Sequence, residues 1–335
     1  MNDKKFMGSI GESKIIERIG ELILKTTGKK LLFDDSFFFA CKKKHCLVSN
    51  SDMFVSTTDA PKQMNFYQMG RKSVLMNISD LMTKGVQPKA IIISLGIPKD
   101  LSISDFDQLM NGIITYCKKW NVEYIGGDIN ETKELIISPT IFGFKNPSNI
   151  LFREGIETGD VLIINNKFGL TGVGFDILLR KGGTLEDYPQ YERAILSVLE
   201  PNDPGNEGCI LANNSLATSS IDSSDGLARS LRELMLSNPQ FGFEITYSDD
   251  LVDKEAVNYC INYNIPLEQV IFEGGEEFIQ IFTINANKYE KAQKKVKMAG
   301  GQLIKVGNVI SVGKIFFKKN NTKIELKRQG FEHFV

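Results

Sequence analysis

Aspartates stand at the ends of predicted strands and helices throughout this 335-residue sequence. The set consists of Asp34, Asp35, Asp52, Asp80, Asp128, Asp222 and Asp225. Hard cations such as Mg²⁺ bind carboxylate, water and phosphate oxygens, so carboxylates gathered from several element ends would suit a magnesium and phosphate site. Aspartate is also a common helix cap and turn residue. Spacing alone does not decide whether these side chains converge, and both interpretations stay open.

The motifs of several other enzyme classes are missing from the sequence. It has no Gly-x-x-x-x-Gly-Lys-Ser/Thr phosphate loop and no Gly-x-Ser-x-Gly nucleophile turn. The glycines of 169–174 have the reversed spacing for a dinucleotide-binding turn. The two histidines, His45 and His333, lie beside a lysine run and near the C-terminus, which argues against histidine acid-base catalysis.

Composition bounds the partners and the compartment. Lys and Arg number 40 against 41 Asp and Glu, and a net charge of -1 gives no reason to expect nucleic acid or a membrane as partner. No stretch approaches the roughly 18 apolar residues of a membrane span, so we expect a soluble, cytoplasmic protein. Five scattered cysteines suit a reducing compartment. We expect Cys41, His45 and Cys46 not to bind zinc, because no further Cys or His cluster accompanies them.

Hydrophobic periodicity predicts the elements that must position the aspartates. In the first half it predicts helices at 13–24, with one buried stripe, at 69–84 and at 106–120, and strands at 37–41, 46–49, 90–97, 122–125 and 135–144. In the second half it predicts strands at 161–164 and 277–283, and helices at 175–181, after 225 and at 286–299. Strands that alternate with covering helices indicate an α/β (α+β) protein, with two domains at 1–147 and 148–335.

Seven short motifs follow one another along the sequence. They are Phe33-Asp34-Asp35, Asn50-Ser51-Asp52, Asn77-Ile78-Ser79-Asp80, Gly126-Gly127-Asp128, Asp222-Ser223-Ser224-Asp225-Gly226-Leu227, Gly274-Gly275-Glu276-Glu277-Phe278 and Gly330-Phe331-Glu332-His333-Phe334. Taken in this order, they resemble the motifs of the thiamine monophosphate kinase family. Their order is similar to that of the superfamily that also contains aminoimidazole ribotide synthetase and selenophosphate synthetase. The Asn-x-Ser-Asp helix, the Ser-Asp-Gly-Leu turn and the C-terminal motif point to the kinase branch.

The resemblance implies a two-domain aminoimidazole ribotide synthetase-like fold. Its N-terminal domain would bind ATP and Mg²⁺ and form a shared barrel across a homodimer. The implied reaction is transfer of the γ-phosphoryl group of ATP to thiamine monophosphate, with several Mg²⁺ ions in the cleft between the domains.

The resemblance also implies roles for individual residues. The metal-binding residues would be Asp35, Ser51, Asp52, Asp80, Asp128, Asp222 and Asp225. The nucleotide would contact Gly127, Asp128, Arg153 and Ser224. The residues closest to the transferred group would be Asp80, Asp222, Asp225 and Arg153. The thiamine moiety would be held by Glu276 and Phe331.

The implied reaction needs positioning and charge neutralisation more than a base, because a phosphate monoester already presents an anionic oxygen as nucleophile. Arg153 would supply a fixed cationic fork for phosphate oxygens. A cationic thiazolium ring would suit the carboxylate of Glu276 and an aromatic face at Phe331. Anchoring of the C-terminus in the core is the equal alternative for Phe331.

The sequence departs from the family's pattern in three places. Phe33 replaces the usual Gly, Glu277-Phe278 replaces Asp-Tyr, and the segment after Asp52 that often carries a His ends in Asp59. We predict that Asp59 takes the place of that His beside the cationic substrate, with capping of the next turn as the alternative. Two other activities stay open, namely another ATP-dependent synthetase of the superfamily and a non-catalytic nucleotide-binding maturation factor.

Overall fold

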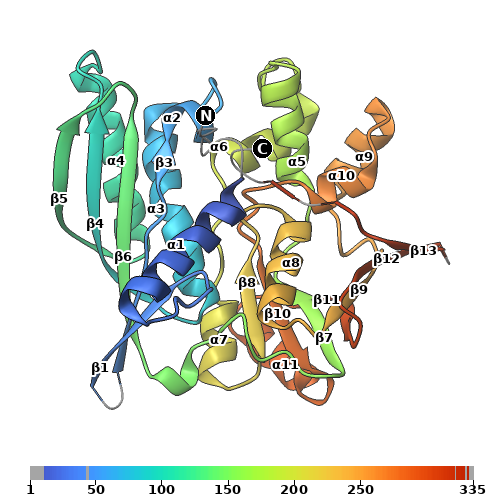
Figure 1. The fold of residues 1–335 in the computed structure, drawn as a ribbon. Helices are drawn as coiled ribbons and strands as arrows, with labels where there is room; N and C mark the ends of the chain where they lie inside the picture. Colours follow the sequence, from blue (N-terminus) through green and yellow to red (C-terminus); the bar gives the residue numbers. More distant parts are fainter. Residues whose placement is uncertain (1–10, 43–44, 321, 329, 332–335) are drawn as a thin grey trace, which may run out of the picture.

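The chain folds around two β-sheets, one built from each half of the sequence (Figure 1). The structure is a computed structural model that describes residues 11–42, 45–320, 322–328 and 330–331. The first sheet has six strands in the order β1-β2-β6-β4-β5, and β3 pairs with β6. Its strands are β1 (Phe37–Lys42), β2 (His45–Asn50), β3 (Phe54–Val55), β4 (Pro88–Ile97), β5 (Glu123–Glu131) and β6 (Ile136–Lys145).

Two long helices, α3 (Phe66–Thr83) and α4 (Ile103–Lys119), pack against one face of the first sheet. The start of α3 is fixed by a capping box, in which Asn65 and Gln68 each accept a hydrogen bond from the other's backbone N–H. In β4, Ile91 and Ile93 point into the resulting core. Two shorter N-terminal helices, α1 (Glu12–Thr27) and α2 (Ser56–Asp59), complete this half.

The other face of the first sheet is apolar and exposed in the described residues. Phe39 in β1 and Phe144 in β6 lie in register with Leu47 between them, and their exposed fractions are 71% and 55%. Ile92 of β4 lies on the same face and is also exposed. A monomer of this chain therefore leaves a row of large apolar side chains in water.

The second sheet has seven strands in the order β13-β12-β9-β11-β7-β10-β8. They are β7 (Asp160–Ile164), β8 (Ser219–Asp222), β9 (Gly242–Thr246), β10 (Gln280–Asn285), β11 (Ile304–Ile310), β12 (Ile315–Lys319) and β13 (Thr322–Glu325). Its helices are α5 (Leu170–Phe175), α6 (Glu192–Leu199), α7 (Glu207–Asn213), α8 (Leu227–Ser237), α9 (Lys254–Tyr263), α10 (Leu267–Phe272) and α11 (Tyr289–Met298). The edge strand β8 lies toward α3, so the two halves meet along this helix (Figure 1).

Most predicted elements are confirmed within a few residues. The helices predicted at 69–84, 106–120 and 286–299 correspond to α3, α4 and α11, and the strands of the first half correspond to β1, β2, β4, β5 and β6. The helix after 225 is α8, whose N-cap Gly226 has the positive φ that favours glycine. Helices α6, α7, α9 and α10 and strand β9 were not predicted.

Four details of the prediction are wrong. The apolar stripe of α1 is not buried by the described residues, and Ile16 and Leu22 are about half exposed. The helix predicted at 175–181 begins earlier, at Leu170. Strand β5 continues through Gly126 and Asp128 instead of ending before them. Strand β10 begins only at Gln280, because Glu276 and Phe278 have positive φ angles of 59° and 50° that a strand cannot contain.

Among the residues that the structure describes, no helix combines the length and the apolar character that crossing a membrane requires.

Candidate active site

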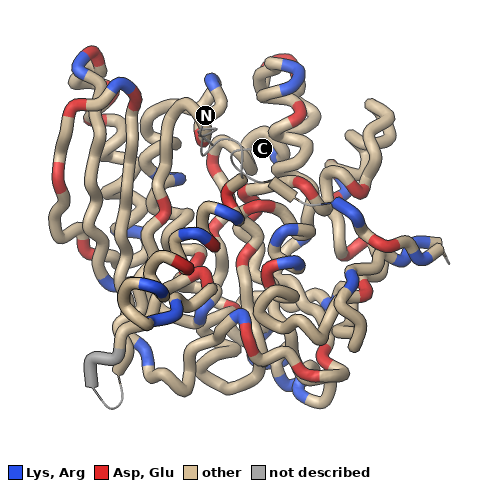
Figure 2. The backbone as a smooth tube through the Cα atoms, in the orientation of Figure 1, with Lys and Arg blue, Asp and Glu red and all other residues tan. Residues whose placement is uncertain are grey.

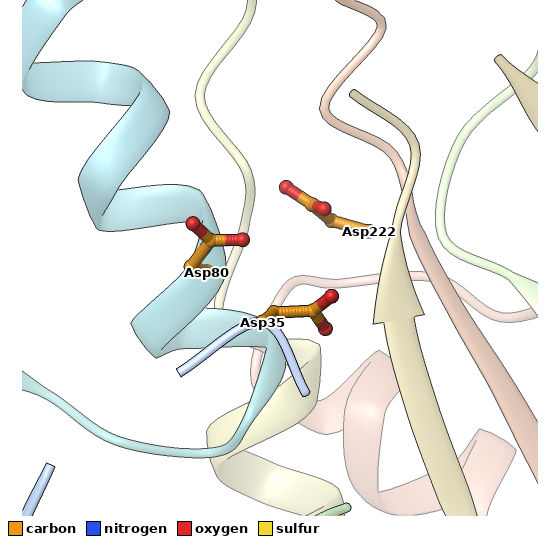
Figure 3. Close-up of side chains that lie close together, drawn as sticks. All are labelled: Asp35, Asp80 and Asp222. Carbon is orange, nitrogen blue, oxygen red and sulfur yellow. The ribbon is translucent and has the colours of Figure 1, made fainter. Parts of the chain in front are cut away.

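Three predicted aspartates meet where the two halves of the chain touch (Figure 3). Asp35 lies in the segment before β1, Asp80 in the last turn of α3 and Asp222 at the end of β8. One carboxylate oxygen of each lies within 4.8 Å of the other two. We call these three residues the aspartate cluster. Figure 2 shows acidic segments gathered in the same central region between the sheets.

The surroundings leave the cluster with surplus negative charge. Burial, followed by repulsion from Asp52, Asp222 and Asp35, raises the pKa of Asp80 well above its ordinary value. Burial and then the charge of Asp35 raise the pKa of Asp222 to about 8. Carboxyl oxygens that are buried, close together and hard to ionise without a counter-charge form the donor set that suits Mg²⁺. The residues present therefore fit a magnesium site.

Asp35 differs from its neighbours. Burial alone would raise its pKa, but Arg153 and Lys84 outweigh burial and lower it. The Arg153 side chain donates from Nε to Asp35 Oδ1 over 2.8 Å, and Lys84 Nζ lies 2.7 Å from Asp35 Oδ2. Asp35 is therefore the cluster member held as an anion by the protein itself.

Asp52 lies beside the cluster, whereas Ser51 lies at the surface. Asp52 has a raised pKa, mainly because it is buried, although hydrogen bonds with Asp80 and Asn50 oppose the rise. Asn50 donates from Nδ2 to Asp80 Oδ2 over 2.6 Å. The exposed Ser51 hydroxyl donates to the Pro139 carbonyl over 2.9 Å. Asp52 is thus a fourth carboxylate next to the aspartate cluster.

Asp225 and Ser224 follow β8 but are not part of the aspartate cluster within the described residues. Burial, followed by the charges of Glu233 and Glu12, raises the pKa of Asp225 to about 7. Its carbonyl accepts the Phe331 N–H over 3.0 Å. The Ser224 side chain is exposed.

Gly127 and Asp128 lie on β5, the strand at the far edge of the first sheet from β1 (Figure 1). The structure leaves Asp128 exposed and does not bring it into the aspartate cluster. A Cβ at position 127 would lie 1.8 Å from the Ile93 carbonyl oxygen of the neighbouring strand, so this close approach requires glycine.

Arg153 is buried and held by carboxylates of both halves. It contacts Asp35, and its Nη2 lies 2.8 Å from Glu233 Oε2. Its guanidinium carbon lies 4.9 Å from the Phe33 ring centroid. The fork is therefore fixed in place, which is the condition for a preorganised contact with phosphate oxygens.

Two of the predicted substrate residues, Asp59 and Glu276, meet at Lys72 of α3, whereas the third, Phe331, is hydrogen-bonded to Asp225. The Lys72 side chain is 0% exposed, and its Nζ lies 2.6 Å from Glu276 Oε1 and 2.7 Å from the Asp59 carbonyl oxygen. The Asp59 carboxylate accepts the N–H of Val55, the residue before α2, over 2.6 Å, so this bond holds the turn that precedes Asp59 and not the next one. Phe331 is 51% exposed, and residues 332–334 of its motif lie outside the described part of the chain.

Two lysines that sequence reasoning missed stand out in this arrangement. Lys72 and Lys84 are the charged residues of α3 and its C-cap with no exposed surface, and both reach across to the second half of the chain. A lysine on an amphipathic helix usually lies in water, so no residue pattern marked them. The usable signal is the position of Lys84, four residues after Asp80 and hence one turn away.

The chain is similar to known proteins along nearly its whole length. Residues 33–144 match the family model described as AIR synthase related protein, N-terminal domain. A thiamine-monophosphate kinase from Nitrosopumilus maritimus is 31% identical over 328 residues, which cover 98% of this chain and 100% of that protein. A thiamine-monophosphate kinase from Methanocaldococcus jannaschii is 27% identical and covers 90% of this chain and 94% of that protein.

Structural similarity extends over the whole fold. The solved structure described as AaThiL complexed with AMPPCP and TMP has a TM-score of 0.83 and 23% identity, and covers 99% of this chain and 100% of that chain. This likeness shows the two-domain aminoimidazole ribotide synthetase-like α/β fold. Because the similarity to the Nitrosopumilus protein covers both chains almost completely, this chain belongs to the thiamine-monophosphate kinase family.

Proposed function

We propose that this chain uses ATP and Mg²⁺ to phosphorylate thiamine monophosphate to thiamine diphosphate by direct in-line transfer of the γ-phosphoryl group. The observation that carries the proposal is the aspartate cluster, whose three carboxylates converge from distant parts of the chain. The activity of the full-length relatives supplies the substrate. Phosphoryl transfer between two phosphates requires close positioning and charge neutralisation, and a dense carboxylate site that holds cations meets both needs.

The magnesium ions, when bound, would offset the charge of the two reacting phosphates. The residues that would hold them are Asp35, Ser51, Asp52, Asp80, Asp128, Asp222 and Asp225. Burial of Asp80 and Asp222 supports this role, because carboxylates in such a site need a cation to stay ionised. Within this set, Asp128 and Ser51 are exposed and would contribute from the rim.

The nucleotide would lie against Gly127, Asp128, Arg153 and Ser224. The fixed guanidinium of Arg153 supports a contact with phosphate oxygens beside the transferred group, together with Asp80, Asp222 and Asp225. Gly127 and Asp128 are exposed on β5, which supports access of a ligand to this strand.

The thiamine moiety would lie at the other end of the cleft, against Asp59, Glu276 and Phe331. The exposed ring of Phe331 supports a stacking contact with a cationic thiazolium. The Glu276 carboxylate is 23% exposed, so one side of it can face a ligand although Lys72 occupies the other. The positive φ of Glu276 indicates a backbone held in a strained form, as is frequent at ligand-binding sites.

A homodimer would cover the open face of the first sheet. We propose that the N-terminal domain, 1–147, pairs with that of a second copy in a shared barrel, and that 148–335 forms the second domain. The exposed row of Phe39, Ile92 and Phe144 supports this assembly. Replacement of Ile92 by Glu should convert the dimer to a monomer in light-scattering chromatography; an unchanged mass would contradict the barrel.

The activity is tested by incubating the purified chain with MgCl₂, ATP and thiamine monophosphate. Thiamine diphosphate and ADP should form in equal amounts. Thiamine monophosphate left unchanged by the folded protein would overturn the substrate. ADP release with another substrate of a panel would indicate a different synthetase of the superfamily, and nucleotide-dependent stabilisation without turnover would indicate a binding factor.

A further inference from the structure

Lys84 is a fully buried lysine beneath the aspartate cluster, outside all the roles assigned so far. It is the C-cap of α3, and its side chain is 0% exposed. Its Nζ lies 2.6 Å from Asp34 Oδ1 and 2.7 Å from Asp35 Oδ2, and it donates to the Ser220 carbonyl over 2.7 Å. The contact with Ser220 is a hydrogen bond and the two carboxylate contacts are ion pairs, so the buried ammonium group has both an acceptor and counter-charges around it.

The side-chain contacts of Lys84 join its own helix to the two segments that carry Asp35 and Asp222. Figure 3 shows the three aspartates of these segments together. Lys84 itself follows Asp80 by one helical turn, and its backbone N–H donates to the Asp80 carbonyl over 3.1 Å. Its side chain binds Asp35 directly. The carbonyl of Ser220 belongs to β8, two residues before Asp222. One side chain therefore ties together the segments of Asp35, Asp80 and Asp222.

Asp34 fixes the segment of Asp35 in place through both of its carboxylate oxygens. Its Oδ1 accepts the Asp35 N–H over 2.9 Å in addition to contacting Lys84. Its Oδ2 accepts the Arg153 backbone N–H over 2.9 Å. Both oxygens of Asp34 are thus bound within the protein, and the charge that balances this buried carboxylate comes from Lys84.

We propose that Lys84 is a positioning residue that assembles the aspartate cluster before any cation binds. Three buried carboxylates repel one another, so a fixed ammonium group between their segments lowers the cost of bringing them together. With a neutral side chain at this position, magnesium binding would have to offset the repulsion between the carboxylates. The inference rests on the proposed magnesium-binding role of the cluster.

The experiment compares the wild-type chain with Lys84→Met, a change that keeps the length of the side chain and removes its charge. Thermal unfolding is followed without nucleotide while MgCl₂ is raised, with KCl keeping the ionic strength constant. The Mg²⁺ concentration at half-maximal stabilisation should rise by about tenfold or more, the usual cost of losing a group that orients metal ligands. In metal-free protein, hydrogen exchange at the Asp35 and Arg153 amides should also become faster.

The matched control is Lys314→Met, which removes an exposed lysine paired with Glu325. It should leave the Mg²⁺ midpoint unchanged. A Lys84→Met midpoint equal to wild type would overturn the role of Lys84, even if the variant unfolds at a lower temperature, because a purely structural lysine changes stability without changing metal affinity. A wild-type chain that Mg²⁺ does not stabilise would overturn the magnesium site as well.

A second variant covers the case in which Lys84→Met does not fold. Asp34→Asn keeps Lys84 and its contact with Asp35 but weakens the anchor of the segment. Its Mg²⁺ midpoint should shift in the same direction by a smaller factor. An unchanged midpoint in this variant would contradict the proposal.

Discussion

The aspartate cluster and the Lys72–Glu276 pair differ in how their buried carboxylates are neutralised. At the aspartate cluster, burial first and then repulsion from neighbouring carboxylates raise the pKa values of Asp80 and Asp222. At the predicted substrate end, burial also raises the pKa of Glu276, but the paired Lys72, a lysine with no exposed surface, opposes the rise. The first end has a surplus of carboxylates that protons or an added cation must balance, whereas at the second end Lys72 balances Glu276 within the protein. A candidate metal site can therefore be recognised from its buried charge, but the proposed substrate site cannot.

The largest effect on activity should come from removing a carboxylate of the aspartate cluster, where the negative charge is in surplus. Asp80→Asn should lower kcat for phosphoryl transfer by about 10³-fold, equivalent to about 4 kcal/mol, because a preorganised charge next to the transferred group is lost. The same change should make the metal-free protein more resistant to denaturant, since one repelling carboxylate is removed.

Steady-state kinetics and chemical denaturation in EDTA measure the two effects. Asp250→Asn, which alters an exposed carboxylate paired with Lys167, is the matched control and should change neither. Activity of Asp80→Asn within tenfold of wild type would show that the cluster does not take part in the reaction.

Removing one partner of the Lys72–Glu276 pair should destabilise the folded protein instead. Lys72→Met leaves the Glu276 carboxylate without its partner, and this should reduce the free energy of unfolding by about 3 kcal/mol. Lys72→Met combined with Glu276→Gln should recover most of the loss, because no unpaired charge remains.

Denaturant unfolding measures this cycle, with Lys119→Met as the control for an exposed ion pair. If the single and double variants are equally unstable, Lys72 acts through packing over the Phe54 ring, which lies 5.7 Å from its Nζ, and not through the charge of Glu276.

The sequence predicted the aspartates of the cluster but not the Lys72–Glu276 pair, for physical reasons. Asp35, Asp80 and Asp222 were found because their motifs occur in a recognisable order, although the spacing of the residues left their convergence open. Periodicity identified α1 correctly but could not show what covers Ile16 and Leu22, since it reports which residues share a face and not what lies against that face. The pairing of Lys72 with Glu276 joins residues far apart in the chain, and no local pattern encodes it.

The pH dependence of stability should reveal the surplus charge directly. A carboxyl group whose pKa is raised by folding binds more protons in the folded than in the unfolded state, so stability falls as the pH rises through this range. For Asp222 the range extends from the ordinary value of 3.8 to about 8. The melting temperature of metal-free protein should therefore fall by several degrees as the pH rises across this window. The melting temperature of the Asp222→Asn variant should fall less.

Thermal unfolding in EDTA at a series of pH values tests this expectation. Saturating Mg²⁺ should flatten the dependence, because bound cations replace protons on the same oxygens. A metal-free protein that gains stability between these pH values would contradict the surplus of negative charge at the cluster.

The smallest effect should come from Phe331, where the two interpretations of the residue predict different measurements. A ring that stacks on the cationic substrate contributes about 0.5–1 kcal/mol at an exposed position, so Phe331→Ala should raise KM for thiamine monophosphate by no more than about tenfold, with kcat nearly unchanged. Because the ring is 51% exposed, the free energy of unfolding should change by less than about 0.5 kcal/mol. Phe331→Leu, which keeps apolar bulk without an aromatic face, should resemble Ala in KM. A loss of about 3 kcal/mol in stability with KM unchanged would instead identify Phe331 as a core anchor.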